Sequence, residues 1–364
     1  MPELKNVLFV INSLLGGGAE RVLTVLADQF AALGIKTTVG LIESKEKRIA
    51  YALDPEVVVA DFSVDTAQGV KGVAQSLFRL RFFVKTQKPD VIIPFMVNNA
   101  VLTLGACLGL RYPVVIRPTI VLLRWGTKIT RLAAPYLLPR AKGAVYQVEA
   151  QRDLLYKYIR GKGIILPNPI KAHATWSNPR QYDEKAVIAV GRLDNQKNYP
   201  LLIRAFSALG DNFPDWRLEI YGDGPARTEL QSEIDGLSLN GRIALAGFAD
   251  DVHAVMHEAS VFVMSSKYEG MPNALMEALC AGCACVTTDF DGGAARVLIN
   301  DGENGLVTPN DDLESMINAL RRLMGSEELR RTLGQNAAKM KEKVDARHIA
   351  LQWISYLESV ISAD

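Results

Sequence analysis

The chain has 364 residues, of which 49% are hydrophobic and 22% are charged, and its formal net charge is +1. This composition excludes a disordered or fibrous protein, and the length exceeds what one hydrophobic core usually serves. We therefore expect a globular enzyme of two domains, and the net charge alone indicates no class of partner.

The N-terminal residues and the cysteines indicate a cytoplasmic protein. Residues 1–12 contain no basic segment followed by a long apolar core, so we expect no signal peptide. Three cysteines cluster in the sequence without a fourth ligand nearby, which argues against a zinc site. We expect reduced thiols in hydrophobic cores, at Cys107, Cys280, Cys283 and Cys285.

The first half alternates short apolar runs with segments of helical spacing. Residues 5–12 are typical of a strand buried on both faces, and a glycine loop at Gly16 to Arg21 leads into a helix that ends at Gly34. This alternation predicts a parallel sheet with helices on both faces. Further strands are expected at residues 36–43, 57–64, 91–95, 113–117, 144–148 and 164–167.

Residues 91–110 carry no charge, so a membrane span has to be considered. We reject it because Pro94 and Gly105 break the run. They leave a strand and a helix, which we expect Asn98 or Asn99 to cap.

Residues 70–88 place apolar side chains on one helix face, with Phe78 and Phe82 beside it and basic residues around it. Such a segment is either a helix that lies on a membrane surface or a core helix with solvated basic residues. The sequence leaves both interpretations open.

Charge is distributed very unevenly. Residues 66–148 contain twelve Lys or Arg and one acid, Asp90. A merely soluble surface normally mixes both signs, whereas this asymmetry attracts nucleic acid, an anionic membrane leaflet or a phosphorylated acceptor. We assign seven of these cations to acceptor or membrane binding: Lys71, Arg79, Arg81, Lys85, Arg124, Lys128 and Arg131.

The second half repeats the alternation after a polar linker. Pro167-Asn168-Pro169-Ile170 ends the first half, so we expect domains at residues 1–169 and 170–345. Residues 346–361 are helical by spacing and lie beyond the second sheet. Strands of that sheet are expected at residues 186–192, 216–221, 242–247, 260–264, 283–289 and 305–307.

A tight loop follows the predicted strand at 260–264. Pro272 suits the first turn of a helix that runs to about Ala281, so the loop amides around Gly270 would point out of a helix N-terminus. Unpaired N–H groups and the helix dipole favour a phosphate or another anion there.

Two carboxylates flank this loop, Glu269 in the loop and Glu277 on the helix. Each can accept a pair of hydrogen bonds from vicinal hydroxyls. A ligand with phosphate in the middle and polyols at both ends is a nucleotide sugar. The alternative is that both glutamates are ordinary solvated surface residues.

Further motifs recur along the whole chain. Arg192 and Lys197 follow the first strand of the second half, at a sheet edge where two cations can neutralise a diphosphate. The complete set is Gly16 to Arg21, Pro167-Asn168-Pro169-Ile170, Gly191-Arg192 with Lys197, Tyr221-Gly222-Asp223-Gly224-Pro225, Glu269 with Glu277, and Asp301-Gly302-Glu303-Asn304-Gly305-Leu306. As a set these motifs resemble those of the family 4 glycosyltransferases, retaining enzymes of the GT-B fold, although none is specific alone.

The resemblance implies two Rossmann-like domains with a cleft between them, the first for the acceptor and the second for the nucleotide sugar. A C-terminal helix within residues 346–364 would cross back onto the first domain. Donor-binding residues implied in this way are Gly17, Gly18, Gly191, Arg192, Lys197, Glu269, Gly270, Met271, Pro272, Asn273 and Glu277.

The resemblance also implies the role of each group. Arg192 and Lys197 would hold the diphosphate, Glu277 the ribose hydroxyls, and Glu269 with the amides of residues 270–273 the donor sugar and phosphate. Gly17 and Gly18 would let the first domain's backbone approach the donor phosphate.

Bond cleavage at the anomeric carbon builds negative charge on the departing diphosphate and positive charge on the sugar ring, so cations and electron-rich groups stabilise the transition state. In the course proposed for the family, the acceptor hydroxyl attacks from the front face and the leaving phosphate oxygen takes its proton. Because Arg and Lys carry the neutralisation, we expect no metal and no other cofactor. The expected catalytic residues are Glu269, Arg192, Lys197 and Arg117.

Three positions depart from known patterns. Asp289-Phe290-Asp291 has the spacing of a metal motif of another fold, but it ends a strand and we expect a structural role. No histidine precedes His173. Many relatives carry a histidine near the donor sugar, and Arg117 stands where we expect that residue. An arginine cannot act as a base at neutral pH, but it can bind a phosphate or a sugar hydroxyl. Arg296 replaces an acidic residue that is usual among relatives, which leaves that contact open.

Rival functions are weaker. A nicotinamide oxidoreductase lacks its fingerprint because Arg21 replaces the third glycine. A sugar-nucleotide epimerase of the same fold remains an alternative. A basic nucleic-acid-binding protein would explain the charge of the first half, but not the carboxylates and cations of the second.

We therefore expect a retaining hexosyl- or N-acetylhexosaminyltransferase that extends a saccharide on a membrane lipid, with polyprenyl diphosphate as the expected carrier, in cell-surface glycan or glycolipid assembly. UDP-sugars are the first choice of donor and GDP-mannose the second. The basic first half predicts a cytoplasmic protein at the inner face of an anionic membrane.

Overall fold

The computed structural model describes residues 3–43, 50–63, 70–119, 128–159, 162–177, 180, 184–237 and 241–363. The chain divides into two compact units, Met1–Lys171 with Val344–Asp364, and Ala172–Lys343. Arg124 lies outside the described residues, as do the side chains of Lys71 and Lys128.

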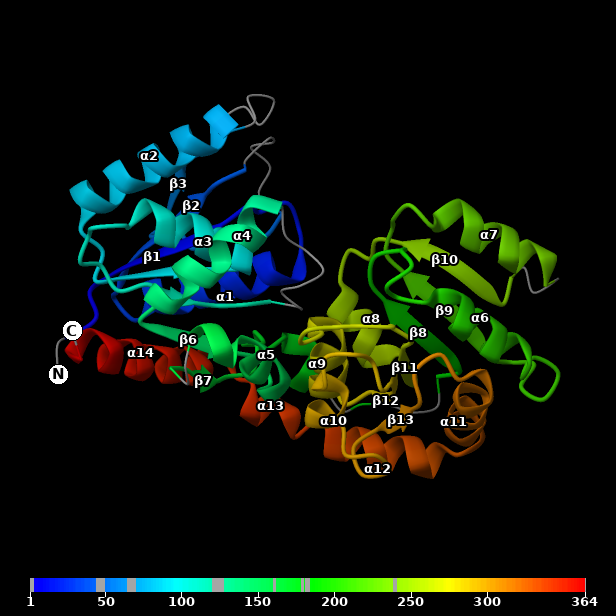
Figure 1. Ribbon diagram of the computed structural model, residues 1–364. Coiled ribbons are helices and arrows are strands. Elements are labelled where there is room, and N and C mark those ends of the chain that lie inside the picture. Colours follow the sequence, from blue (N-terminus) through cyan, green and yellow to red (C-terminus); the bar gives the residue numbers. More distant parts are fainter. Residues whose placement is uncertain are drawn as a thin grey trace. The chain divides into compact units, whose positions relative to one another are not determined.

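The first unit is a parallel sheet covered by helices (Figure 1). Its strands are β1 Asn6–Ile11, β2 Lys36–Leu41, β3 Val58–Asp61, β4 Val91–Pro94, β5 Val115–Ile116, β6 Gly143–Tyr146 and β7 Ile164–Ile165. They pair in the orders β3-β2-β1-β4 and β5-β6-β7. Parallel bridges from Ile92 to Val114 and from Phe95 to Arg117 join the two groups into one sheet.

Alternate residues of β1 enter two hydrophobic cores, one on each face of this sheet. Val7, Phe9 and Ile11 pack with the helices at the two ends of the chain, whereas Leu8 and Val10 pack with the intervening helices. The helices are α1 Gly18–Ala32, α2 Val70–Gln87, α3 Val97–Ala106, α4 Lys128–Leu137, η2 Leu138–Arg140, α5 Glu149–Ile159 and α14 Ala346–Ser362.

The second unit is a six-stranded parallel sheet between helical layers. Its strands, β8 Ala186–Val190, β9 Arg217–Tyr221, β10 Ile243–Gly247, β11 Val261–Met264, β12 Ala284–Thr288 and β13 Leu306–Thr308, are ordered β10-β9-β8-β11-β12-β13. Its helices are η3 Ala174–Ser177, α6 Tyr199–Ser207, α7 Arg227–Gly236, α8 Val252–Glu258, α9 Asn273–Cys280, α10 Ala294–Leu298, α11 Leu313–Gly325, α12 Glu327–Ala337 and α13 Met340–Lys343.

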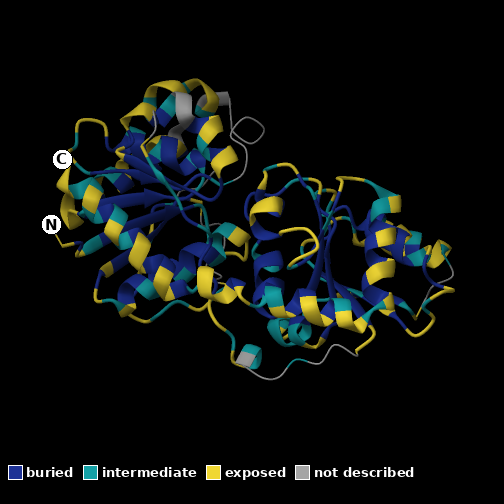
Figure 2. Ribbon diagram, turned by 90° about the horizontal axis from the view of Figure 1, so that it is seen from below, coloured by how far each residue is buried: buried dark blue, intermediate teal, exposed yellow. Residues whose placement is uncertain are grey.

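In each unit the central strands are buried and the outer faces of the helices are exposed (Figure 2). The predicted fold class, two Rossmann-like domains with the C-terminal helix returned to the first, is confirmed. The cysteines are free and buried, as predicted for core residues.

Two local expectations differ from the structure. The strands predicted at 113–117 and 164–167 shorten to β5 and β7, since Pro113 and Pro167 cannot donate to a sheet. The predicted cap at Asn98 or Asn99 is wrong: α3 begins at Val97, and the Asn99 amide donates instead to the Phe95 carbonyl at 2.8 Å.

Helix α2 presents apolar side chains on two sides. Leu80 and Val84 are buried and Leu77 and Phe83 pack against the same core, so the core-helix interpretation accounts for one side. The other side holds two exposed apolar residues, Phe78 and Phe82. Among the residues that the structure describes, no helix has the length and apolarity that a membrane crossing requires.

Replacement of Trp353 by alanine tests the packing of α14 on the first unit. Trp353 is fully buried in a core that it shares with β1 and α1. We expect Trp353→Ala to lower the free energy of unfolding by about 3–5 kcal/mol, measured by urea titration. Leu351→Ala, at an exposed position of the same helix, is the control and should cost under about 1 kcal/mol. Equal midpoints for both variants would contradict the packing.

Candidate functional site

The candidate site lies at the carboxyl edge of the second sheet. The loop after β8 carries Lys197 and the loop after β11 carries Glu269, and these two strands are neighbours. In the order β10-β9-β8-β11-β12-β13 this is the point where the winding direction reverses. Ligands of open α/β sheets bind at such switch points, because the loops diverge there.

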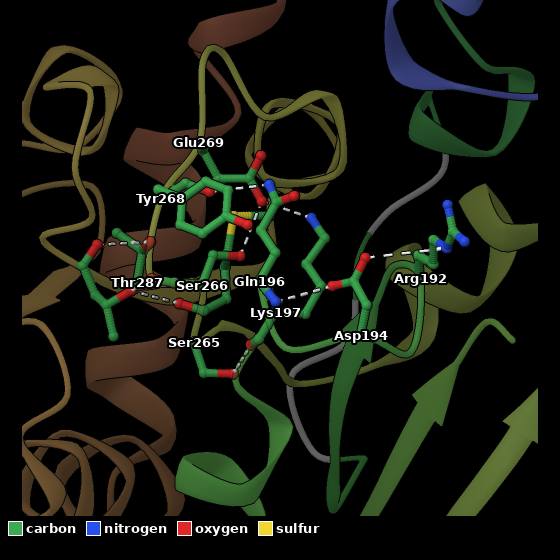
Figure 3. A network of polar contacts seen from close by, with 11 residues as sticks. Arg192, Asp194, Gln196, Lys197, Ser265, Ser266, Tyr268, Glu269 and Thr287 are labelled. Atoms are coloured by element: carbon green, nitrogen blue, oxygen red, sulfur yellow. Dashed lines mark hydrogen bonds and ion pairs between the residues drawn. The ribbon is translucent and has the colours of Figure 1, made fainter. Parts of the chain in front are cut away.

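Lys197 and Glu269 form an ion pair at this point (Figure 3). Lys197 Nζ lies 2.7 Å from Glu269 Oε1, and the two side chains are only 17% and 8% exposed. The Ser266 hydroxyl donates to the same carboxylate oxygen at 2.9 Å. The structure thus brings Lys197, which was predicted to bind phosphate, into direct contact with Glu269, which was predicted to bind the donor sugar.

Hydrogen bonds to backbone carbonyls hold the two loops together. The Lys267 N–H donates to the Gln196 carbonyl at 2.8 Å, and the Gln196 amide donates to the Tyr268 carbonyl at 2.9 Å. The Ser265 hydroxyl donates to the Lys197 carbonyl at 2.8 Å. Consequently the position of Lys197 depends on the loop that carries Glu269.

The carboxylate of Asp194 fixes the turn before Lys197. Asp194 Oδ1 accepts the backbone N–H groups of Gln196 at 3.1 Å and of Lys197 at 3.2 Å. Behind it, burial raises the pKa of the Tyr199 phenol well above its usual range, and the charges of Asp194 and Glu269 add to this effect. Tyr199 therefore remains a neutral hydroxyl at this site.

The loop at residues 291–292 supports Glu269 from behind. The Glu269 N–H donates to the Asp291 carbonyl at 3.1 Å. A Cβ on Gly292 would lie 2.1 Å from the Glu269 carbonyl oxygen, and the φ of Gly292 is +119°. Only glycine fits this approach. Nearby, Arg296 Nε lies 2.7 Å from Asp289 Oδ2, so these two side chains pair with each other.

The other predicted donor residues are placed as follows. Gly270, Met271 and Pro272 are buried before α9, Asn273 begins that helix, and Glu277 is only 2% exposed on it. Arg192 differs: its side chain is 72% exposed, 4.0 Å from Asp194, and points away from the Lys197–Glu269 pair (Figure 3).

Several residues of the site were missed from the sequence: Asp194, Gln196, Tyr199, Ser265, Ser266 and Gly292. Two signals were available. Ser265-Ser266 directly follows a buried strand, where hydroxyls reach the sheet edge, and Asp194 begins a polar turn in which aspartate commonly accepts backbone N–H groups.

Gly17 and Gly18 belong to the first unit, at the start of α1. The Glu20 carboxylate accepts the Gly17 N–H at 2.7 Å and the Gly16 N–H, and the Ser13 hydroxyl donates to it at 2.8 Å. A side chain of the protein therefore already binds the amide of Gly17, one of the two glycines predicted to approach the donor phosphate.

Arg117 is buried at the carboxyl edge of the first sheet and is 1% exposed. Burial lowers the pKa of its guanidinium to about 9, so it is still charged at neutral pH. It donates to Asn168 Oδ1 and stacks on Phe95, 5.2 Å from the ring centre, while its Nε–H has no hydrogen-bond partner among the described residues. Gln147 donates to the same Asn168 oxygen at 2.8 Å.

The predicted acceptor and membrane cations differ in their surroundings. Arg79 donates to the Ser63 carbonyl, and Arg81 donates to the Ala106 and Leu108 carbonyls, each at 2.7 Å. Lys85 and Arg131 are exposed. Arg81 thus fixes a turn, which the sequence did not predict.

Comparison with known proteins relates the chain to glycosyltransferases. The sequence model of the family described as "Glycosyl transferases group 1" matches residues 172–340, nearly all of the second unit. A Campylobacter jejuni protein named GalNAc-alpha-(1->4)-GalNAc-alpha-(1->3)-diNAcBac-PP-undecaprenol alpha-1,4-N-acetyl-D-galactosaminyltransferase is 26% identical over 99% of this chain and 100% of its own length.

The chain is a glycosyltransferase, and its second unit matches the group 1 family model.

One further relative and one solved structure are similar to this chain. The N-acetylgalactosamine-N,N'-diacetylbacillosaminyl-diphospho-undecaprenol 4-alpha-N-acetylgalactosaminyltransferase of Campylobacter jejuni is 35% identical, over 48% of this chain and 47% of that protein. The Anabaena protein HepE, solved in complex with UDP-glucose, superposes with a TM-score of 0.77 at 21% identity, over 98% of this chain and all of HepE. The latter match establishes the GT-B fold.

The contact of Gly292 with Glu269 can be tested by adding one methyl group. We expect Gly292→Ala to displace Glu269 and to lower kcat/KM of the transferase by about 100-fold, because misplacement of a site by 1 Å costs about that much. Gly236→Ala is the matched control, since no heavy atom beyond the backbone of its own helix lies within 4 Å of its Cβ position. Steady-state kinetics on both variants, with circular dichroism to confirm folding, decide the matter. Unchanged kinetics in Gly292→Ala would show that this contact does not shape the site.

Proposed function

We propose that the chain is a retaining glycosyltransferase that moves a hexose or an N-acetylhexosamine from a nucleotide sugar to a saccharide on a lipid carrier. The single observation that carries this proposal is the Lys197–Glu269 pair at the switch point of the second sheet. One fixed cation and one fixed carboxylate lie side by side there, as a phosphate next to a sugar requires.

UDP-sugars are the proposed donors, with GDP-mannose next. Support comes from HepE, whose solved complex contains UDP-glucose. Glu277 lies buried on the helix that follows the Glu269 loop, and we propose that it accepts hydrogen bonds from the ribose hydroxyls.

The proposed acceptor is a saccharide linked to polyprenyl diphosphate, in cell-surface glycan or glycolipid assembly. Support comes from the two Campylobacter relatives, whose names specify undecaprenol-linked acceptors. We propose that the protein acts in the cytoplasm as a peripheral protein of the inner membrane face, held by the basic residues of its first unit.

In the proposed mechanism the diphosphate competes with Glu269 for Lys197. As the anomeric C–O bond breaks, Lys197 stabilises the growing negative charge on the leaving phosphate, and Glu269 accepts hydrogen bonds from the donor sugar. The exposed side chain of Arg192 would rotate to bind the same diphosphate. The acceptor hydroxyl attacks on the face of the leaving group, which takes its proton, so the configuration is retained. No metal ion is needed because lysine and arginine supply the positive charge.

Two substitutions separate donor binding from turnover. Glu277→Ala should raise the donor KM by about 10- to 100-fold, because hydrogen bonds to a charged group are lost. Lys197→Ala should lower kcat by about 100- to 1,000-fold, because the leaving charge loses its cation. Exposed Glu328 provides the control, Glu328→Ala. Near-normal kinetics in both site variants would mean that the donor site lies elsewhere.

The identity of the donor can be tested by thermal stabilisation. A ligand that binds only the folded state stabilises it and so raises Tm. The stabilisation is about 2.7 kcal/mol when the ligand concentration is one hundred times Kd. We expect UDP-sugars to raise Tm more than GDP or ADP sugars. The largest shift with a GDP-sugar would reverse the donor assignment, and consumption of the sugar nucleotide without any acceptor would favour the epimerase.

A further inference from the structure

The protein holds the carboxylate of Glu269 by only one of its two oxygens. Oε1 lies 2.7 Å from Lys197 Nζ and accepts the Ser266 hydroxyl at 2.9 Å (Figure 3). In the described part of the chain, no hydrogen bond reaches Oε2. Both oxygens of a carboxylate are acceptors, so the second oxygen is left for a ligand.

The proposed mechanism removes one of the two contacts of Oε1. When the diphosphate of the donor binds Lys197, the ion pair with Glu269 is broken. Glu269 is nearly buried, and a buried charged group that loses a partner costs more free energy than an exposed one. The Ser266 hydroxyl is the other group that the structure shows on this oxygen. Its contact therefore matters more in the donor complex than in the free protein.

Ser266 is fixed from the sheet and not from the Lys197 turn. It is fully buried just after β11, and its carbonyl accepts the Thr288 hydroxyl at 2.6 Å. Thr288 is itself fully buried at the end of β12, the neighbour of β11. Lys197, by contrast, reaches Glu269 from the loop after β8. A movement of the lysine side chain thus leaves Ser266 in place.

We propose that Ser266 is a positioning residue of the transferase. Its hydroxyl keeps hold of Glu269 Oε1 after the donor diphosphate has taken Lys197, so that Oε2 stays directed at the donor sugar. Ser266 acts through Glu269 and does not itself touch the donor. The inference rests on the proposed function. A hydroxyl that merely fills the end of β11 would instead cost stability on removal, without any dependence on Glu269 or Lys197.

Steady-state kinetics on Ser266→Ala test this role. We expect kcat to fall about 10-fold, because a hydrogen bond to a charged group is lost. The donor KM should change less than about 3-fold, since Lys197 still holds Glu269 in the free protein. Ser260→Ala is the matched control: Ser260 is also fully buried, at the opposite end of β11, and its loss should leave both constants unchanged. An equal fall of kcat in the two serine variants would overturn the proposal.

A double-mutant cycle with Glu269→Gln shows whether Ser266 acts through Glu269. In the Glu269→Gln protein the charge is gone, so adding Ser266→Ala should lower kcat no further. Additive losses would overturn the proposal. A normal kcat in Glu269→Gln would overturn both the proposed role of Glu269 and this inference. A low kcat in Glu269→Gln with a normal kcat in Ser266→Ala would overturn the inference alone.

Thermal unfolding without donor gives a measurement that needs no activity. Lys197→Ala or Ser266→Ala alone leaves Oε1 with one contact, whereas the double variant removes both. We expect Tm to fall further in the double variant than the sum of the two single losses, because the carboxylate is then buried without compensation. Lys197→Ala/Ser260→Ala should be additive. Additive losses in Lys197→Ala/Ser266→Ala as well would show that the two side chains do not share Glu269, and would overturn the proposal.

Discussion

The ion pair between Lys197 and Glu269 is the interaction on which the second unit's site depends. Both side chains are largely removed from water, and a buried charge is tolerated only when a partner and hydrogen bonds compensate it. Here each charge compensates the other, and the Ser266 hydroxyl serves the carboxylate. In the proposed mechanism a diphosphate that approaches Lys197 would replace one negative partner with another. Donor binding would then be coupled to the position of the Glu269 loop through a single lysine.

Close backbone approaches make this arrangement rigid. A Cβ on Gly222 would lie 2.0 Å from the Gly191 carbonyl oxygen, so the turns after β8 and β9 touch directly. Together with the hydrogen bonds between the Gln196 turn and the Tyr268 loop, these contacts leave the functional side chains little freedom. Preorganised groups of this kind stabilise developing charge without reorganisation at the moment of reaction.

The sequence predicts the sheets and the approximate place of the site well, because both follow from local patterns. Apolar runs of strand length mark the buried strands, and Lys197 and Glu269 each follow one of them, so their presence at one sheet edge could be foreseen. Their mutual pairing could not, since it depends on which strands are neighbours. The same holds for Arg117, whose buried guanidinium donates to Asn168, some fifty residues later in the sequence. The contact of Glu20 with its own glycine loop is local, three and four residues away, and could have been predicted as a capping box.

The packing of α14 has a consequence for how the chain is made. Trp353 and its neighbours complete a core whose other members come from β1 and α1, at the opposite end of the chain. During synthesis most of the first unit emerges early, yet its apolar face stays uncovered until α14 has left the ribosome. The second unit, whose residues are contiguous, can mature before then. The core around the first strand is thus completed last, although that strand is synthesised first. A product truncated before α14 would expose the hydrophobic surface that α14 covers, and chaperones and proteases recognise such surfaces.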